Sequence, residues 1–117
     1  MTEIEELQKM VKEFCVTRDW DQFHNPKDLA IGISTEANEL LDLFRFKTDE
    51  QMNEMMNNLE KREAISEELS DVFYFLLRFS QLYGFDMKKG LEKKMKKNNE
   101  KYPVDKTKGK NMKYTEI

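Results

Sequence analysis

Apolar residues recur every three or four positions along most of this chain, which is the spacing of amphipathic helices. The pattern predicts helices over about 4–17, 26–46, 48–59, 60–83 and 86–99. Asn25 followed by Pro26 is typical of a helix start, and Gly84 is placed to end the longest helix. We therefore expect an all-α fold, a compact helical bundle of four to five helices.

The length of the chain and the end of the periodic pattern set the expected domain organisation. At 117 residues the chain fits one domain. Beyond Pro103 the apolar spacing stops, and lysines are frequent among the remaining residues. We predict a domain over 1–103 and a basic C-terminal tail over 104–117 that either stays mobile or folds over a neighbour.

Four acidic residues lie inside apolar stripes instead of opposite them. At about 100° per residue, Glu36 and Glu39 fall on either side of Leu43. The same arrangement recurs 32 positions later, where Glu68 and Asp71 occupy the matching places. A solvated helix face would carry its charges away from the apolar stripe. Two helices are thus expected to present the same acidic, inward-facing site.

Such inward-facing carboxylates must be neutralised, because burying an unpaired one costs several kcal/mol. A Mg²⁺ ion suits four carboxylates at once, with Mn²⁺ as a substitute, since both prefer oxygen ligands. The structural alternative is that the acids form salt bridges with Arg45, Arg78 or Lys94 and only fix helix packing. A dinuclear iron site would need Glu-x-x-His pairs, and the one histidine, His24, lies in a connection.

Charge and composition exclude several classes of function. The formal net charge is −3, from 20 basic and 23 acidic residues. The chain therefore lacks the positive electrostatic potential needed to bind a nucleic-acid polymer without regard to its sequence. The single cysteine, Cys15, is expected to be a small buried residue. Neither a signal-peptide pattern nor a run of about 20 apolar residues is present, so we expect a cytoplasmic protein without a membrane partner.

Three stretches resemble a known family. They are RDWDQFHNPKDLAIGISTEANELLDLF, ISEELSDVFYFLLRFS and KMKKNNEKYPVDKTKG. The chain is similar over 18–109 to the MazG-like all-α nucleoside triphosphate pyrophosphohydrolases, and among them to the compact dCTP pyrophosphatase type. The three stretches together are highly specific, whereas an isolated E-x-x-E would carry no weight.

The resemblance implies a Mg²⁺-dependent hydrolase that converts (d)NTP and water to (d)NMP and pyrophosphate, with dCTP-like substrates favoured and nucleotide-pool sanitation as its role. It implies a homo-oligomer, a dimer or a tetramer, with active sites between subunits. It assigns the metal to Glu36, Glu39, Glu68 and Asp71. It assigns the nucleotide pocket to a larger set of residues: Trp20, Asp21, Gln22, Phe23, His24, Phe46, Phe75, Lys94, Asn98 and Tyr102.

Within this reading we expect Glu39 to orient the attacking water as a general base, because it lies at the edge of its stripe. Four lysines are candidates to hold the departing pyrophosphate: Lys47, Lys94, Lys101 and Lys108. Val11 and Phe75 depart from the histidine and tyrosine that dCTP-hydrolysing relatives can carry, which weakens the expected cytosine preference.

Other readings of the same residues stay open. Trp20 and Phe46 are alternatively core aromatics, and His24 alternatively caps the turn before Pro26. Two other classes of function are a nucleotide-binding module without catalysis and a structural helical-bundle adaptor.

Overall fold

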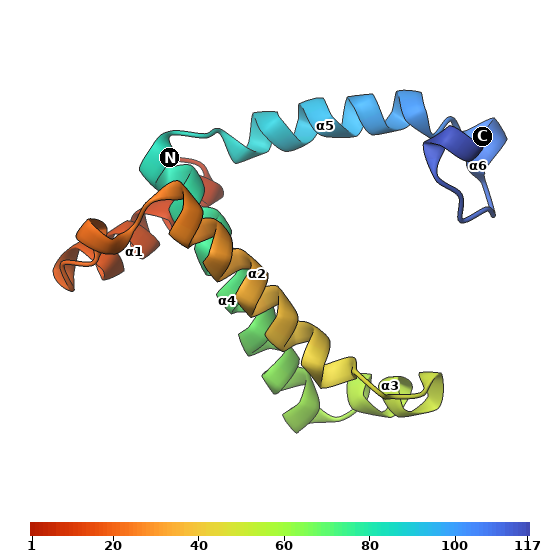
Figure 1. Ribbon diagram of the computed structural model, residues 1–117, viewed down its shortest axis with the longest axis horizontal. Helices are drawn as coiled ribbons and strands as arrows, with labels where there is room; N and C mark the ends of the chain where they lie inside the picture. Colours follow the sequence, from red (N-terminus) through yellow and green to blue (C-terminus); the bar gives the residue numbers. More distant parts are fainter. The chain divides into compact units, whose positions relative to one another are not determined.

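The computed structural model describes residues 1–117 and confirms the all-α prediction (Figure 1). Six α-helices and two short 3₁₀ helices follow one another along the chain: α1 Glu3–Thr17, η1 Asp21–Phe23, α2 Pro26–Phe44, α3 Asp49–Met56, α4 Leu59–Tyr83, α5 Met87–Lys101, α6 Val104–Thr107 and η2 Tyr114–Glu116. The additional helix, α6, is a single turn in the segment predicted as a tail. None of these helices is both long and apolar enough to cross a membrane.

The chain divides into two compact units, Met1–Gly84 and Phe85–Ile117. The first unit holds α1 to α4 and all four acids of the predicted metal site. The second unit holds α5, α6 and η2, with the Tyr102 and Tyr114 rings edge to face at 6.2 Å. The mobility predicted for 104–117 stays a prediction.

Local capping signals explain where the helices begin. The Asn25 side chain accepts a hydrogen bond from the Asp28 N–H at the start of α2. Thr48 and Gln51 form a reciprocal capping box at the start of α3. Gly84, with φ of 72°, ends α4 in the left-handed conformation that glycine adopts without steric cost.

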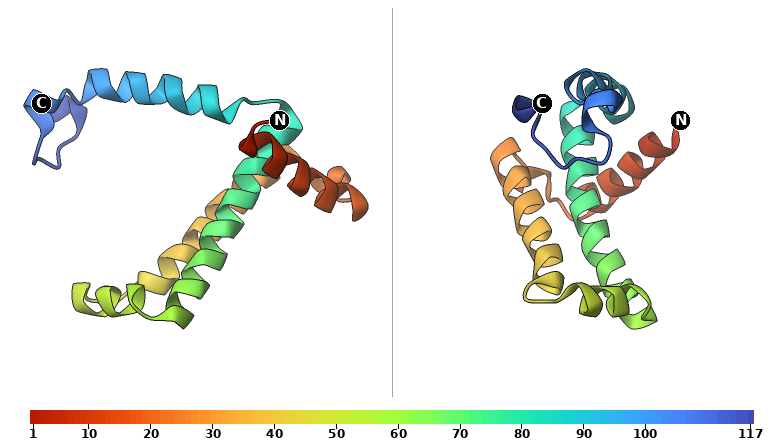
Figure 2. Two further views of the ribbon diagram at one scale, coloured as in Figure 1. Left: turned by 180° about the vertical axis from the view of Figure 1, so that it is seen from behind. Right: turned by 90° about the vertical axis from the view of Figure 1, so that its right-hand side faces the viewer.

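In the first unit α2 and α4 run side by side and antiparallel, and α1 packs on another side of α4 (Figure 2). Cys15 and Val11 of α1 form a buried cluster with Leu77 of α4, and the Cys15 Sγ lies 3.1 Å from the Tyr74 hydroxyl. The prediction that Cys15 is a small buried residue is therefore confirmed. Because α4 is covered by α1 as well as by α2, it buries more than the single stripe that carries the acids.

The contact between α2 and α4 is close at Gly32. A Cβ atom added there would lie only 2.4 Å from the ring of Phe75, so the ring occupies space that any other residue would fill. Gly32 is one helical turn before Glu36 on α2, and Phe75 is one turn after Asp71 on α4. This packing therefore sets the distance between the two helices next to the acids.

The second helix ends earlier than the spacing predicts. It was expected to reach residue 46, but α2 ends at Phe44. Phe46 has a positive φ of 64°, outside the helical region, and the chain turns there into the Thr48 cap of α3. The difference arises because the apolar spacing continues past the point at which the backbone must turn.

Candidate functional site

The packing of α2 against α4 brings acids from the two helices together. One carboxylate oxygen from each of Glu36, Glu39 and Glu68 lies within 4.8 Å of the others. The two helices each place an acidic i,i+3 pair on one face. Three carboxylates at this spacing can donate oxygen ligands to one small cation.

Two oxygen atoms of this cluster have no partner within the protein. The Oε2 atoms of Glu36 and Glu68 are buried and make no hydrogen bond. Burial raises the pKa of Glu36, and the neighbouring carboxylates of Glu39, Asp71 and Glu68 raise it further. Burial also raises the pKa of Glu68, again with contributions from Glu39 and Asp71. Burial and the neighbouring charges therefore shift both acids toward their protonated forms when no cation is bound.

Asp71 is the fourth acid of the predicted set. Its charge is close enough to raise the pKa of both Glu36 and Glu68. It is not one of the three residues whose oxygens lie within 4.8 Å of one another, and it is exposed, as is Glu39. The site thus has a half-buried side, at Glu36 and Glu68, and a solvent-facing side.

The salt-bridge alternative for the acids finds no support in the ion pairs of the structure. Arg45 pairs with Asp42, and Arg78 pairs with Asp21. The other two pairs join Lys9 to Glu13 and Lys88 to Glu92. Because no basic side chain neutralises the four acids, a divalent cation is the group that best fits this oxygen-only donor set.

The connection between α1 and α2 carries the residues predicted to line the nucleotide pocket. Asp19 takes a positive φ of 54°. The Gln22 side chain donates hydrogen bonds to the backbone oxygen and to a carboxylate oxygen of Asp19, both at 3.0 Å. Trp20 packs edge to face on Phe14 of α1 at 5.5 Å. The ring of Phe23 is exposed. The connection is thus held against α1, with one aromatic ring free for a ligand.

Arg78 of α4 fixes this connection from the other side. Its side chain is completely buried. The guanidinium forms an ion pair with Asp21 and donates from Nε to His24 Nδ1 at 2.9 Å. It also donates from Nη1 to Gln81 Oε1 at 2.7 Å. Sequence reasoning treated Arg78 only as a possible partner of the acids, although it lies two helical turns after Asp71, within about 20° of the same face.

The alternative role of His24, as the cap of the turn before Pro26, is confirmed for its backbone. His24 is the C-cap of η1, and its N–H donates to the backbone oxygen of Asp21 at 3.2 Å, whereas Asn25 caps α2. Its imidazole takes no part in this cap and bonds to Arg78 instead. Burial lowers the pKa of His24, and the charge of Arg78 lowers it further, whereas Asp21 opposes the shift. His24 is therefore a neutral imidazole near pH 7.

The two aromatic residues predicted from later parts of the chain differ in their surroundings. Phe46 is 89% exposed, with the Arg45 guanidinium 4.9 Å from its ring centroid, so it is not a core aromatic. Phe75 is half-buried between Gly32 and Tyr74 and lies on the same face of α4 as the acids. An exposed ring such as Phe46 is available to stack on a planar ligand.

The remaining predicted pocket residues belong to the second unit. Lys94, Asn98 and Tyr102 lie on α5 or at its C-terminal cap. Asn98 lies inside the helix, and its backbone oxygen accepts the N–H of Tyr102 at 2.8 Å. Their part in a nucleotide site stays a prediction.

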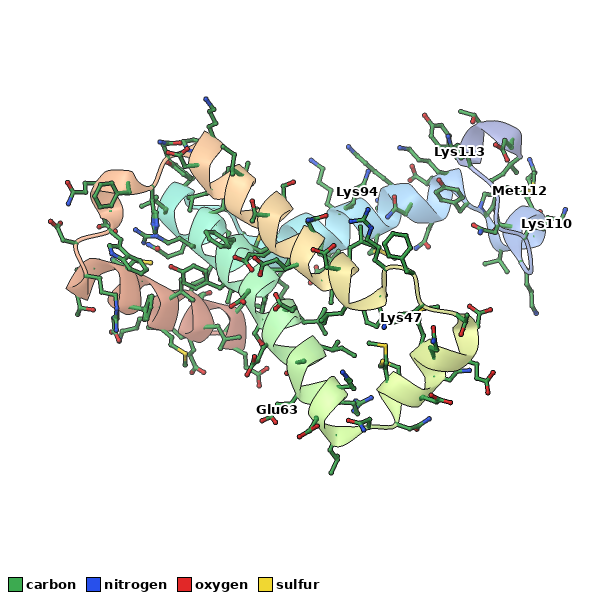
Figure 3. All side chains as sticks on the ribbon, turned by 60° about the horizontal axis from the view of Figure 1, so that its bottom comes forward. Lys47, Glu63, Lys94, Lys110, Met112 and Lys113 are labelled. Carbon is green, nitrogen blue, oxygen red and sulfur yellow. The ribbon has the colours of Figure 1, made fainter.

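A cavity of about 480 Å³ lies where α2, α3 and α4 meet. Lys47, in the connection from α2 to α3, lines it and points toward the space between these helices, whereas Glu63 on α4 points outward (Figure 3). The other lining residues are Asp42, Leu43, Gln51, Glu54, Met55, Asn58, Lys61 and Ala64. Lys47 and Lys61 offer this cavity two ammonium groups that can bind a phosphate oxygen, and Asp42 and Glu54 balance their charge.

Comparisons with known proteins show which family and fold this chain resembles. A model of the MazG-like family matches residues 31–117. The dCTP pyrophosphatase 1 of Rattus norvegicus is 33% identical over 114 residues, covering 97% of this chain and 67% of that protein. The Homo sapiens protein of the same name gives the same identity and coverage. The crystal structure of a pyrophosphatase from Archaeoglobus fulgidus has a TM-score of 0.78 and 32% identity, covering 88% of this chain and 94% of that one.

Proposed function

Because this chain belongs to the MazG-like family and is a nucleoside triphosphate pyrophosphatase, we propose that it works with Mg²⁺ held by Glu36, Glu39, Glu68 and Asp71. In this proposal it converts (d)NTP and water to (d)NMP and pyrophosphate, with Mn²⁺ able to replace Mg²⁺. Family membership implies a divalent metal in general, and the choice of Mg²⁺ rests on the all-carboxylate donor set.

The observation that carries this proposal is the pair of buried, unpartnered oxygens on Glu36 and Glu68. Each is a strong acceptor without a donor, and each belongs to a carboxylate within 4.8 Å of two others. Buried polar atoms are nearly always satisfied. A cation shared by these oxygens would satisfy both and remove the repulsion that raises the pKa of each acid.

The roles of the chain's own groups in the reaction follow from their positions. When bound, Mg²⁺ neutralises phosphate oxygens and lowers the pKa of water. Glu39, exposed at the edge of the cluster, orients the water that attacks the α-phosphorus and accepts its proton. Lys47, in the cavity at the end of α2, is placed to bind the departing pyrophosphate. Lys94, Lys101 and Lys108 are further candidates from the sequence alone.

For the nucleoside, the proposed pocket of the first unit combines the connection 20–24 with Phe46 and Phe75. Nucleotide contacts of Lys94, Asn98 and Tyr102 in the second unit are proposed from the family resemblance alone. A preference for dCTP-like substrates is supported by the names of the rat and human relatives. Val11 is buried in the α1–α4 cluster, so it offers no polar contact to a base. We therefore propose that the activity is shared with these relatives while the cytosine preference is weaker.

The first test is the identity of the products. With Mg²⁺ present, wild-type protein is expected to release NMP and pyrophosphate from a triphosphate, because water attacks the α-phosphorus. Phosphorus NMR of the reaction with a panel of NTPs and dNTPs measures the cleavage point and the preferred base together. Orthophosphate with NDP would contradict the assigned cleavage, and full activity in excess EDTA would contradict the metal site.

We also propose that the protein is a homo-oligomer, a dimer or a tetramer. Large apolar side chains are exposed on the first unit, among them Met10 at 63% and Phe73 at 42%. Leu77 of α4, by contrast, is buried against α1 and adds nothing to this surface. Static light scattering at micromolar concentration is expected to give at least twice the chain mass of 14.1 kDa. A monomer under these conditions would refute the assembly.

A further inference from the structure

Arg78 is an unusual group to find in the interior of so small a protein. Charged side chains are almost never fully buried unless they are paired, and a hydrophobic residue often packs there with equal stability. Arg78 is completely buried, and its ion-pair partner Asp21 is half-exposed on its side chain. Packing alone therefore gives no reason for a guanidinium at this position.

The hydrogen bonds of Arg78 define the protonation state of His24. The guanidinium is always protonated and has no acceptor atom, so its Nε–H can bond only to a lone pair. That bond reaches His24 Nδ1 at 2.9 Å. Nδ1 therefore carries no proton, and the proton of the neutral imidazole is on Nε2.

The other ring nitrogen of His24 is free to meet a ligand. Nε2 makes no hydrogen bond within the protein, and it is not among the buried polar atoms that lack a partner. A neutral imidazole with its proton on Nε2 is a hydrogen-bond donor at that atom over a wide pH range. The donor lies in the connection that Arg78 ties to α4, the helix that also carries Glu68 and Asp71.

We propose that Arg78 is a positioning residue that holds His24 as a neutral Nε2–H donor for an acceptor atom of the nucleotide. Asp21 and Gln81 complete the device by fixing the remaining guanidinium nitrogens. The nucleotide half of this inference rests on the proposed function, whereas the half that concerns Arg78 and the imidazole rests on geometry alone.

The tautomer can be measured directly because His24 is the only histidine of the chain. In protein labelled with ¹⁵N-histidine and free of nucleotide, the ring nitrogens are expected to show the Nε2–H tautomer. The midpoint of the ring's titration is expected to lie below the 6.5 of a free histidine, because burial and the charge of Arg78 lower its pKa. A proton on Nδ1, or a midpoint at or above 6.5, would overturn the role of Arg78.

Substitutions separate this role from general packing. In Arg78→Met, which keeps a long side chain but no donor, Nδ1–H is expected to appear and the midpoint to rise, since Asp21 remains. The matched control is Gln8→Ala, which removes a 2.8 Å bond to Ser80 on the same helix without touching His24. The control is expected to leave the imidazole signals unchanged, and an equal change in both variants would refute a specific effect.

The nucleotide half is tested by two replacements of His24. Glutamine can place a donor near the Nε2 position, whereas asparagine imitates Nδ1 and leaves the outer donor out. His24→Asn is expected to raise KM about 3- to 10-fold with kcat little changed, the effect of one lost hydrogen bond, and His24→Gln is expected to raise it less. Adding Arg78→Met to His24→Asn is expected to cost no more than the larger single effect.

Equal KM values for the Asn and Gln variants would overturn the donor role. A wild-type protein that neither binds nor hydrolyses any nucleotide would overturn the proposed function and, with it, the nucleotide half of the inference. The tautomer measurement would still decide whether Arg78 sets the state of His24, because it uses protein without nucleotide.

Discussion

Glu68→Gln or Asp71→Asn is expected to lower kcat by about 100-fold or more at saturating Mg²⁺. The amide replaces a charged oxygen ligand by a weaker, neutral one in a site made only of carboxylates. Changes outside the ligands of a metal already cost about 10- to 100-fold, so loss of a ligand should cost at least as much. Steady-state release of pyrophosphate from a triphosphate measures the effect.

A matched control is available on the same helix. Glu63 is exposed on α4 and points outward in Figure 3. Glu63→Gln makes the same chemical change and removes one negative charge from the same helix. It is expected to keep wild-type turnover within about twofold, since exposed surface charges contribute little. Equal losses in Glu63→Gln and Glu68→Gln would show a nonspecific charge effect instead of a metal site.

The second large effect expected is a melting temperature that depends on Mg²⁺ and on pH together. At about pH 8, Mg²⁺ at 100 times its dissociation constant stabilises the folded state by about 2.7 kcal/mol, or about 10 °C in melting temperature. As the pH falls toward about 5, protons compete for Glu36 and Glu68, whose pKa values are raised, so the gain should decrease. Thermal melting in EDTA and in Mg²⁺ over this range checks it.

The sign follows from which state binds protons more tightly. In EDTA, Glu36 and Glu68 hold protons more tightly when folded, so their contribution is fully present below about pH 4.5 and is lost as the pH rises through their folded pKa values. His24 has a lowered pKa and acts oppositely, losing stability as the pH falls below 6.5. Its contribution is common to both series, so subtracting them isolates the acids. A Mg²⁺ gain that is independent of pH would contradict protonation of the site.

Local sequence signals were sufficient to predict most of the helix boundaries. The caps at Asn25, Thr48 and Asp86 and the stop at Gly84 are each satisfied by side chains or backbone within a few residues. Such features depend on short-range chemistry, and the predicted helix starts and the end of α4 lie close to the observed ones. The end of α2 was missed because the backbone turns at Phe46 while the apolar spacing continues.

The two acidic pairs could be predicted because the same pattern of acids and apolar residues occurs on two helices. A chance origin of this repeat is improbable. Which acids are half-buried was not visible. Glu36 and Glu68 are covered and Glu39 and Asp71 are exposed, a division that depends on the register of α2 against α4. That register is set in part by Phe75 against Gly32, a contact between residues far apart in the chain.

The long-range polar contacts of Arg78 could not be predicted from the sequence. Arg78 bonds to Asp21, 57 residues away, and to His24, 54 residues away. No periodicity links these positions, and α4 has two covered sides where the apolar pattern indicated one. A basic residue two turns after Asp71 on the same face was the available signal, but nothing in the sequence distinguishes a partner in the connection from a partner among the acids.

The measurement that tests the metal site most directly is the thermal melting of wild type and Asp71→Asn, each in EDTA and in Mg²⁺, with turnover assayed on the same samples. None of the four acids forms an ion pair with a basic residue, so the substitution leaves no buried cation unpaired. Removing one negative charge also relieves repulsion among the other three acids. We predict that Asp71→Asn melts at or above the wild-type temperature in EDTA, gains little from Mg²⁺ and does not turn over. A variant that melts far lower in EDTA, yet keeps its Mg²⁺ stabilisation and its activity, would show that Asp71 serves architecture and would contradict the four-carboxylate site.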